Sequence, residues 1–420
     1  MTEIRTASRQ DKDTNPTELT GAARAGFRER NFIVFMAAVT SIVAFSVDMM
    51  LPALADIGSE YRLSDANDTQ LVIIAFIFSF GVSQLFFGPL TDAFGRRKIL
   101  VGSLFSFALI SVAALFSPNF ETLLLARALA GVAAGAARTA SQAVVRDCFV
   151  SSDMARIMSL VMAVFMVAPL AAPVIGQFII YLSNWHWIFL FLGIGGAITA
   201  TIGALYLKET QDPENIRPLS AKRVSQAFLE SLTYRRSTGY TLVSVAFTGA
   251  LFTYVVMAPQ VFGELYGLGG NFVYAFMAAA GALTVSSIVN GKLVKTVVLR
   301  KIVHLALIAF FIMAIIFVVL AYLDSIPFEV MLLITMSTMF LFGFVATNTS
   351  AIALEPMGHI AGTASSVINT VSVSGGALIG GIIGQLYDGT VVPMATGYLI
   401  LAIIAIIAAF WGERGSLTLR

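Results

Sequence analysis

The chain has 420 residues, of which 58% are hydrophobic and only 12% are charged, and its formal net charge is +2. Soluble globular proteins carry about 25% charged residues, so this chain has too few polar side chains to cover a water-soluble surface. Its single cysteine, Cys148, excludes an internal disulfide and a thiolate metal cluster. The composition therefore predicts an all-α polytopic membrane protein.

Apolar segments, taken in chain order, predict twelve transmembrane helices, each near the roughly 20 residues that cross a bilayer core. The first six are expected at 32–54, 70–92, 98–116, 120–146, 156–182 and 186–207, and the second six at 239–264, 270–292, 301–323, 328–352, 362–387 and 393–412. The remaining segments predict a disordered tail over 1–31, a linker over 208–238 and a short tail over 413–420, which leaves an N-terminal bundle over 32–207 and a C-terminal bundle over 239–412.

Basic residues fall in every second connection between spans. Arg96, Arg97 and Lys98 follow the second span, and Arg300 and Lys301 precede the ninth, whereas the alternate loops are short and mostly acidic or neutral. Loops that stay in the cytoplasm are enriched in lysine and arginine. The pattern predicts a multi-pass protein of the bacterial inner membrane, surrounded by lipid, with both termini in the cytoplasm.

Three short patterns recur between the halves at offsets slightly above 200 residues. They are Ile175-Gly176-Gln177 with Ile383-Gly384-Gln385, Gly88-x-Leu90 with Gly291-x-Leu293, and Pro52 with Pro259. Repeats at one offset predict a duplicated unit, here two pseudo-symmetric six-helix bundles. This is the usual layout of a secondary transporter, whose site lies where the repeats meet.

Two charged residues lie deep inside spans. Asp48 is six residues from the end of the first span and Arg127 is seven residues inside the fourth, which places them about 9 and 10 Å deep at 1.5 Å per residue. A charge at mid-bilayer costs at least about 2.5 kcal/mol, so such residues normally face a partner or a watered cavity. We expect an ion pair between them. Asp48 is the candidate carrier of a transported proton, because burial favours its neutral form and Arg127 its charged form; the alternative is a static pair that fixes helix packing.

The loop after the second span reads GPLTDAFGRRKIL. It resembles the loop signature of the major facilitator superfamily, with Ala93 in place of the usual arginine. The resemblance implies a gate in which Asp92, Arg96 and Asp147 latch the two halves in the outward-facing state; the alternative is that the loop only anchors the topology. The gating residues it implies are Gly88, Asp92, Gly95, Arg96, Arg97 and Asp147.

The fourth span carries Arg127, Gly131 and Gly135, a spacing that resembles a motif of drug:proton antiporters. Arg138 lies three helical turns further on and shares the face of Arg127 to within about 20°. It either reaches an anionic group of a substrate or snorkels to the cytoplasm.

The fifth span contains MVAPLAAPVIGQ, which resembles the proline–glycine motif of antiporters. Pro169 and Pro173 each remove a helix hydrogen bond, and Gly176 allows a close helix contact. Alanine in place of the common glycine before each proline, together with VRDCF after the fourth span and ALEPMGHIAGTASS before the eleventh, resembles the bicyclomycin and chloramphenicol resistance branch. Candidate residues for the wall of a substrate cavity are Met49, Arg138, Met162, Met166, Phe252, Tyr254 and Asn369.

The sequence therefore predicts a monomeric transporter that exports small amphipathic drugs, such as bicyclomycin- or chloramphenicol-like compounds, in exchange for protons by alternating access. The proton gradient would drive it without a cofactor or metal, and no nucleic acid is expected as a partner. One alternative is an exporter or proton symporter of a single physiological metabolite, with drug efflux incidental. A membrane receptor is disfavoured by the gate loop, and an enzyme by the absence of a P-loop, a metal motif or a nucleophile elbow.

Overall fold

The computed structural model describes residues 21–212, 214, 229–230, 233–323 and 326–415. Twelve helical segments in this part of the chain are long and apolar enough to cross a membrane, which confirms the predicted number of spans and the all-helical membrane class. The N-terminal half contains α1 (Glu29–Asp48), α2 (Leu54–Glu60), α3 (Leu71–Phe94), α4 (Arg96–Ala114), α5 (Phe120–Cys148), α6 (Ser151–Phe165), α7 (Ala168–Leu182) and α8 (His186–Tyr206). The C-terminal half contains α10 (Arg235–Ala258), α11 (Phe272–Leu293), α12 (Leu299–Tyr322), α13 (Phe328–Leu354), α14 (Ala361–Gln385) and α15 (Val392–Gly412).

Local sequence explains where these helices break. Lipid offers no partner for backbone N–H and C=O groups, so apolar segments satisfy them internally as helices. In the first span, a 3₁₀ turn at Leu51–Ala53, which contains Pro52, separates α1 from α2. Gly95 ends α3 with a φ of +96°, a conformation that side chains on L-residues rarely adopt, and α4 begins at the next residue.

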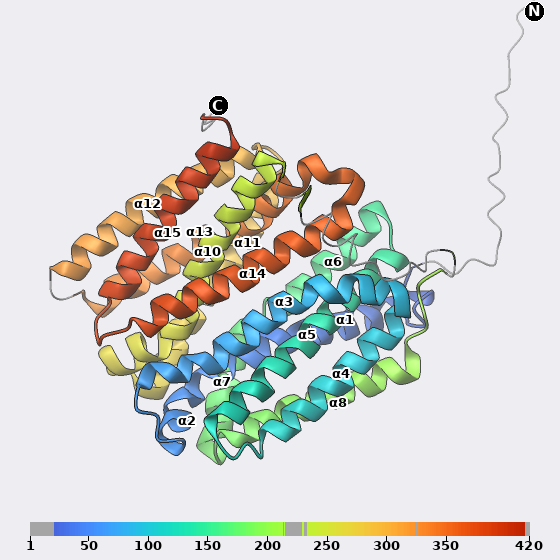
Figure 1. The fold of residues 1–420 in the computed structure, drawn as a ribbon, viewed down its shortest axis with the longest axis horizontal. Coiled ribbons are helices and arrows are strands. Elements are labelled where there is room, and N and C mark those ends of the chain that lie inside the picture. Colours follow the sequence, from blue (N-terminus) through green and yellow to red (C-terminus); the bar gives the residue numbers. More distant parts are fainter. Residues whose placement is uncertain (1–20, 213, 215–228, 231–232, 324–325, 416–420) are drawn as a thin grey trace, which may run out of the picture.

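The two halves repeat one packing pattern (Figure 1). In the N-terminal half α3 packs against α5 and α4 against α8; in the C-terminal half α11 packs against α13 and α12 against α15. These are the same pairs when the spans of each half are counted from one to six. The packing agrees with the duplicated six-helix unit that the sequence repeats predicted.

Small residues bring α3 and α5 into direct contact. A Cβ on Gly131 would overlap the backbone oxygen of Phe76, and one on Gly135 would overlap the hydroxyl of Ser83. Close approach of two backbones through glycine is a common way to pack helices in membranes, where burial of apolar surface gives little driving force.

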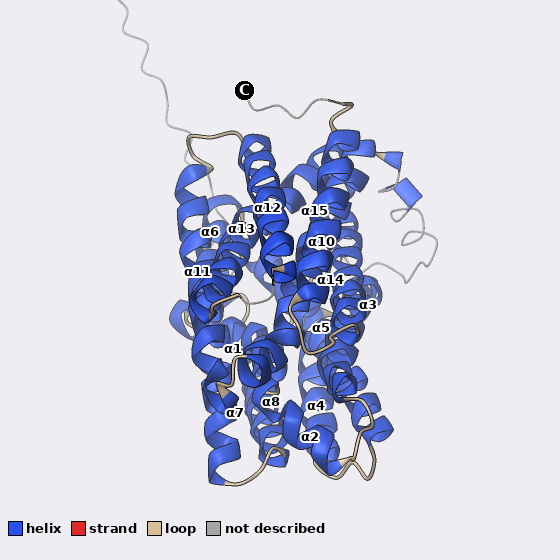
Figure 2. Cartoon of the chain, turned by 90° about the vertical axis from the view of Figure 1, so that its left-hand side faces the viewer, coloured by secondary structure: helices blue, strands red, loops and turns tan. Residues whose placement is uncertain are grey.

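The halves meet mainly through α3 and α14, with a second contact between α7 and α11. We call the end of the bundle at which α1 begins and α15 ends the terminal end; it is at the top of Figure 2, and the opposite end, which contains α2, is at the bottom. In the fifth span, α7 packs against α11 of the other half. The earlier part of this span, α6, lies toward the terminal end and packs on α1 and α5 of its own half.

The amino-terminal tail is shorter than predicted. Residues 1–20 lie outside the described part of the chain, but Gly21–Ala23 forms a 3₁₀ turn and α1 begins at Glu29 rather than after residue 31. The reason is a set of contacts with the start of the linker. Arg24 donates to the carboxylate of Asp212 (2.5 Å), which raises the pKa of the guanidinium, and the backbone N–H of Lys208 donates to Ala25 (3.1 Å). Most of the predicted linker and residues 416–420 lie outside the described residues.

Candidate functional site

Arg127 is buried at the centre of the N-terminal half, with 1% of its surface exposed. Its guanidinium donates to the backbone oxygens of Val72 (3.0 Å) and Ser46 (2.7 Å), and its Cζ lies 4.6 Å from the centre of the Phe76 ring. Two carbonyl dipoles and an aromatic face thus stabilise this buried cation. The side chain ties α5 to both α1 and α3.

The expected ion pair between Asp48 and Arg127 is not formed. Asp48 is the last residue of α1 and is 6% exposed, and its carboxyl group forms no hydrogen bond or ion pair within the described part of the chain. We expected the pair because both residues lie at a similar depth, but depth does not determine which face of its helix a residue occupies. Ser46, whose carbonyl holds Arg127, and Asp48 are two residues apart, about 200° around a helix.

Asp48 instead lies toward the boundary between the halves. The 3₁₀ turn that follows it packs against α10, and Tyr254 on α10 is within electrostatic range of its carboxyl group. Tyr254 is buried and stacks on Phe276, with the ring centres 5.3 Å apart. A buried carboxyl group at such a boundary can gain or lose a proton as the halves move, because its surroundings change with them.

The predicted gating residues Asp92, Arg96 and Asp147 come together at the terminal end. Nη1 of Arg96 lies 2.6 Å from Asp92, and Nε donates to Asp147 over 3.0 Å. The turn at Gly95 makes this possible, because it ends α3 and reverses the chain, so that Arg96, the first residue of α4, lies next to Asp92. Arg96 is 8% exposed, so its pair with Asp147 is largely shielded from solvent, whereas the side chain of Asp92 is 44% exposed.

In this conformation the ion cluster lies within the N-terminal half and the start of the linker, and the predicted latch between the halves in the outward-facing state stays a prediction. The amide of Gln211 donates to the backbone oxygen of Asp92 (2.7 Å). The carboxylate of Glu209 accepts the backbone N–H groups of Arg96 (2.9 Å) and Arg97 (3.2 Å). Among the predicted gating residues, Gly88 is the one that faces the other half, where a Cβ would lie 3.6 Å from the hydroxyl of Ser366 on α14.

The helix-bending residues surround the division of the fifth span. Between α6 and α7 the chain turns at Met166 and Val167, and Pro169, which has no N–H to donate, lies in the first turn of α7. Pro173 lies inside α7, and Gly176 packs directly on the backbone oxygen of Met49.

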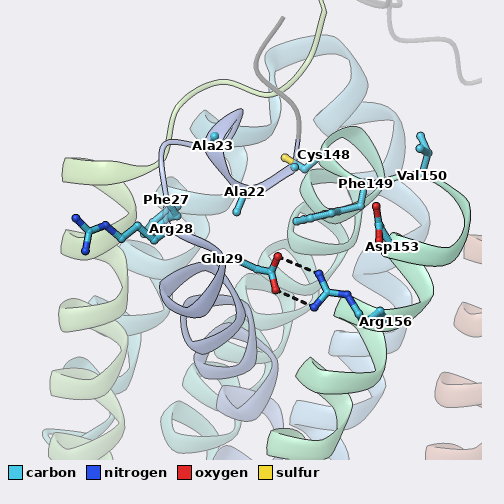
Figure 3. Close-up of a pocket in the computed structure, with 11 residues that line it drawn as sticks. Ala22, Ala23, Phe27, Arg28, Glu29, Cys148, Phe149, Val150, Asp153 and Arg156 are labelled. Carbon is cyan, nitrogen blue, oxygen red and sulfur yellow. Dashed lines mark hydrogen bonds and ion pairs between the residues drawn. The ribbon is translucent and has the colours of Figure 1, made fainter.

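An exposed ion pair holds α6 against α1. The guanidinium of Arg156 donates to both carboxylate oxygens of Glu29, over 2.8 and 2.9 Å. The pair faces a cavity of about 570 Å³ between the amino-terminal turn, the start of α1 and the turn from α5 to α6 (Figure 3). It fixes the terminal end of the fifth span to its own half.

The predicted cavity residues have varied surroundings. Met49 and Tyr254 are fully packed, and Met49 is a packing residue against Gly176 rather than an open wall. Arg138 does not extend to the terminal end, because its Nη1 donates to the hydroxyl of Thr40 on α1 over 3.0 Å. The half-buried members are Met162, Met166, Phe252 and Asn369.

At the opposite end, four carboxamide side chains join the halves. Asn67 and Gln70 come from a 3₁₀ helix (Ala66–Gln70), Gln260 from a π-helix (Pro259–Leu265) and Gln385 from the end of α14. The amide of Gln70 donates to Oε1 of Gln260 (2.5 Å) and to the backbone oxygen of Gly384 (3.1 Å). Gln260 donates in turn to Oδ1 of Asn67 (2.8 Å). We call these four residues the amide cluster.

Backbone groups complete the amide cluster. Gln385 donates to the backbone oxygen of Asn67 (2.7 Å), and the Asn67 amide donates to that of Tyr387 (2.9 Å). Gln70 is fully buried, and Asn67 is 7% exposed. Burial raises the pKa of Tyr387 to about 12, so this neighbour is uncharged at neutral pH. Neutral hydrogen bonds therefore hold the halves together at this end.

Sequence reasoning missed the amide cluster, although one signal pointed to it. The repeated Ile-Gly-Gln pattern contains Gln385 and its counterpart Gln177, and both lie at contacts between the halves: a Cβ on Gly270 would lie 2.9 Å from the amide nitrogen of Gln177. Asn67 and Gln70 gave no such signal, because polar residues at the ends of spans are common.

Comparison of the sequence with known proteins identifies the family to which the chain belongs. The family model described as Major Facilitator Superfamily matches residues 36–381. The chain is 30% identical to an uncharacterized MFS-type transporter of Bacillus subtilis, over 91% of this chain and 96% of the relative. It is 28% identical to the bicyclomycin resistance protein homolog of Haemophilus influenzae, over 90% and 95%. It is 24% identical to the multidrug resistance protein MdtL of Salmonella paratyphi A, over 90% and 94%.

Proposed function

Because the chain belongs to the major facilitator superfamily, we propose that it exports small amphipathic drugs, such as bicyclomycin- or chloramphenicol-like compounds, in exchange for protons. Members of this superfamily are transporters rather than enzymes, and the names of two relatives refer to bicyclomycin and multidrug resistance. The proton gradient would supply the energy, with no cofactor, and the protein would act as a monomer in the inner membrane.

The buried carboxyl group of Asp48 carries the proposal. It has no cationic partner within the described residues and lies beside α10 of the other half. An unpaired carboxylate is costly at this depth, so the neutral form would prevail in this conformation. Asp48 would take up a proton from outside when the halves separate at the opposite end, and it would carry that proton through the return to the present conformation. Binding of a drug from the cytoplasm would then displace the proton to the cytoplasmic side, so that drug and proton move in opposite directions.

Alternating access gives the two ends different roles in this proposal. With the terminal end in the cytoplasm, as the basic loops predict, the amide cluster closes the outer end, while α6 packs on α1 and α5 of its own half. This conformation would accept a drug from the cytoplasm or the inner leaflet. Release outside would require the amide cluster to separate and α6 to approach the C-terminal half.

One observation favours the second candidate, a transporter of a single metabolite. Arg138 is held inside the N-terminal half by Thr40, with a guanidinium that has further N–H groups to donate. Such a group suits an anionic solute better than a neutral drug.

The test is export of a panel of drugs, including bicyclomycin and amphenicols, from cells that express the protein, with and without a proton uncoupler. We expect uncoupler-sensitive export of several unrelated compounds, and loss of this export in Asp48→Asn. Asp56→Asn is the matched control, because Asp56 is an exposed carboxylate on α2. Export that Asp48→Asn leaves undiminished would remove the proposed role of Asp48, and no drug export by the wild type would favour the metabolite.

A further inference from the structure

A groove lies on the surface of the N-terminal half at the terminal end. It has a volume of about 710 Å³ and is formed by the end of α3, the start of α4 and the end of α8. Three basic side chains line it, those of Arg97, Lys98 and Lys208. The groove is thus a positively charged recess between membrane-spanning helices, at the level where those helices leave the bilayer.

The basic groups of this groove are not neutralised by acidic partners. Neither Lys98 nor Lys208 forms an ion pair with any residue that the structure describes, and Arg97 uses one Nη group on the backbone oxygen of Ala204 (2.7 Å). Glu209 is the one carboxylate among the lining residues, and its oxygens accept the backbone N–H groups at the start of α4. The groove therefore retains an unbalanced positive charge.

The corresponding loop of the other half differs in the surroundings of its arginine. Arg300 is the counterpart of Arg97 in the sequence repeat, but its guanidinium lies 2.6 Å from Glu355 and 3.4 Å from Glu413. Arg97 has no acidic partner among the residues that the structure describes, so the two arginines differ. Lys292 and Lys295 of the other loop resemble Lys98 and Lys208 in forming no ion pair with those residues, which makes them a matched comparison for charge alone.

The rim of the groove is apolar and exposed. Phe94 is 54% exposed, Leu205 is 72% exposed and Tyr206 is 59% exposed. Aromatic side chains are enriched where the hydrocarbon of a bilayer meets water, and basic pockets between transmembrane helices at this level bind anionic head groups. A ligand that fits both parts needs a negative group for the lysines and hydrocarbon for the rim.

We propose that this groove binds the head group of an anionic phospholipid, with its phosphate between Lys98, Lys208 and Arg97 and its acyl chains along the exposed rim. A soluble phosphate would satisfy the cations but not the rim, and a zwitterionic lipid would bring its own cation to the recess. The site does not depend on the proposed transport of drugs, since none of its residues contacts Asp48 or the amide cluster.

Native mass spectrometry of the purified full-length protein tests this assignment, with phosphatidylglycerol and phosphatidylcholine as probes in mixed micelles. We expect the wild type to retain phosphatidylglycerol preferentially. Each lysine near the surface should contribute about fivefold to the affinity, so Lys98→Gln with Lys208→Gln should weaken binding roughly 25-fold. Lys292→Gln with Lys295→Gln, in the corresponding loop of the other half, is the matched control and should retain the lipid.

Three results would overturn the assignment. Equal weakening by the control pair would mean that only general attraction to basic loops is measured. Displacement of the lipid by the same concentration of glycerol phosphate, which has no acyl chains, would make the groove a phosphate site. Equal retention of both lipids would remove the anionic preference. If the double variant does not fold, Lys98→Gln and Lys208→Gln taken singly should each show the fivefold loss.

Discussion

Gly384→Ala should open the end of the bundle that the amide cluster closes. A Cβ at this position would overlap Oε1 of Gln70 and lie 2.9 Å from a methyl group of Val256, closer than side chains pack. Gln70 would have to leave, and its hydrogen bonds to Gln260 and to the backbone of Gly384 would break. At about 1 kcal/mol for each hydrogen bond, the closed state loses about 2 kcal/mol, which shifts its equilibrium with the open state about 30-fold.

The distance between two spin labels at this end measures the shift. Ser64→Cys in the N-terminal half and Glu329→Cys in the C-terminal half are exposed attachment sites, with Cys148 replaced by serine. We expect a second, longer distance in Gly384→Ala. Gly281→Ala on α11 is the matched control, because a Cβ there meets no atom within 4 Å. Gln70→Ala removes the same two hydrogen bonds without an overlap and should also lengthen the distance. Unchanged distances in both variants would refute the role of the amide cluster.

Two further substitutions probe the N-terminal half. Arg96→Ala leaves Asp92 and Asp147 without their shared cation. We therefore expect a lower melting temperature and slower drug export, with Arg96→Lys intermediate between this variant and the wild type. Export at the wild-type rate would mean that the cluster only anchors the loop. Arg127→Lys keeps the charge but replaces a planar fork by a compact ammonium. It should lose one of two hydrogen bonds to carbonyl groups, each worth about 1.5 to 3 kcal/mol for a charged donor, and the melting temperature in detergent would show this loss.

The sequence predicted what depends on local composition and missed what depends on helix rotation. Apolar length alone gave the twelve spans, because the backbone in lipid must form helices. Close spacing in the chain brought Asp92 and Arg96 together, since they lie four residues apart on the two sides of the turn at Gly95. Asp48 and Arg127 lie on different spans, and only the rotation of each helix decides whether they meet. A sequence gives their depth, not that rotation.

The kind of contact at each end of the bundle, neutral or charged, determines whether pH and salt can shift the equilibrium between conformations. The contacts that must separate at the opposite end are neutral amides and backbone groups, and the pKa of Tyr387 lies near 12. External pH and salt therefore act only weakly on this closure. The ion cluster around Arg96 lies within one half, so its charges need not part when the halves move. A proton that drives the change must then act elsewhere, and Asp48, buried beside the other half, is the carboxyl group whose surroundings the motion alters.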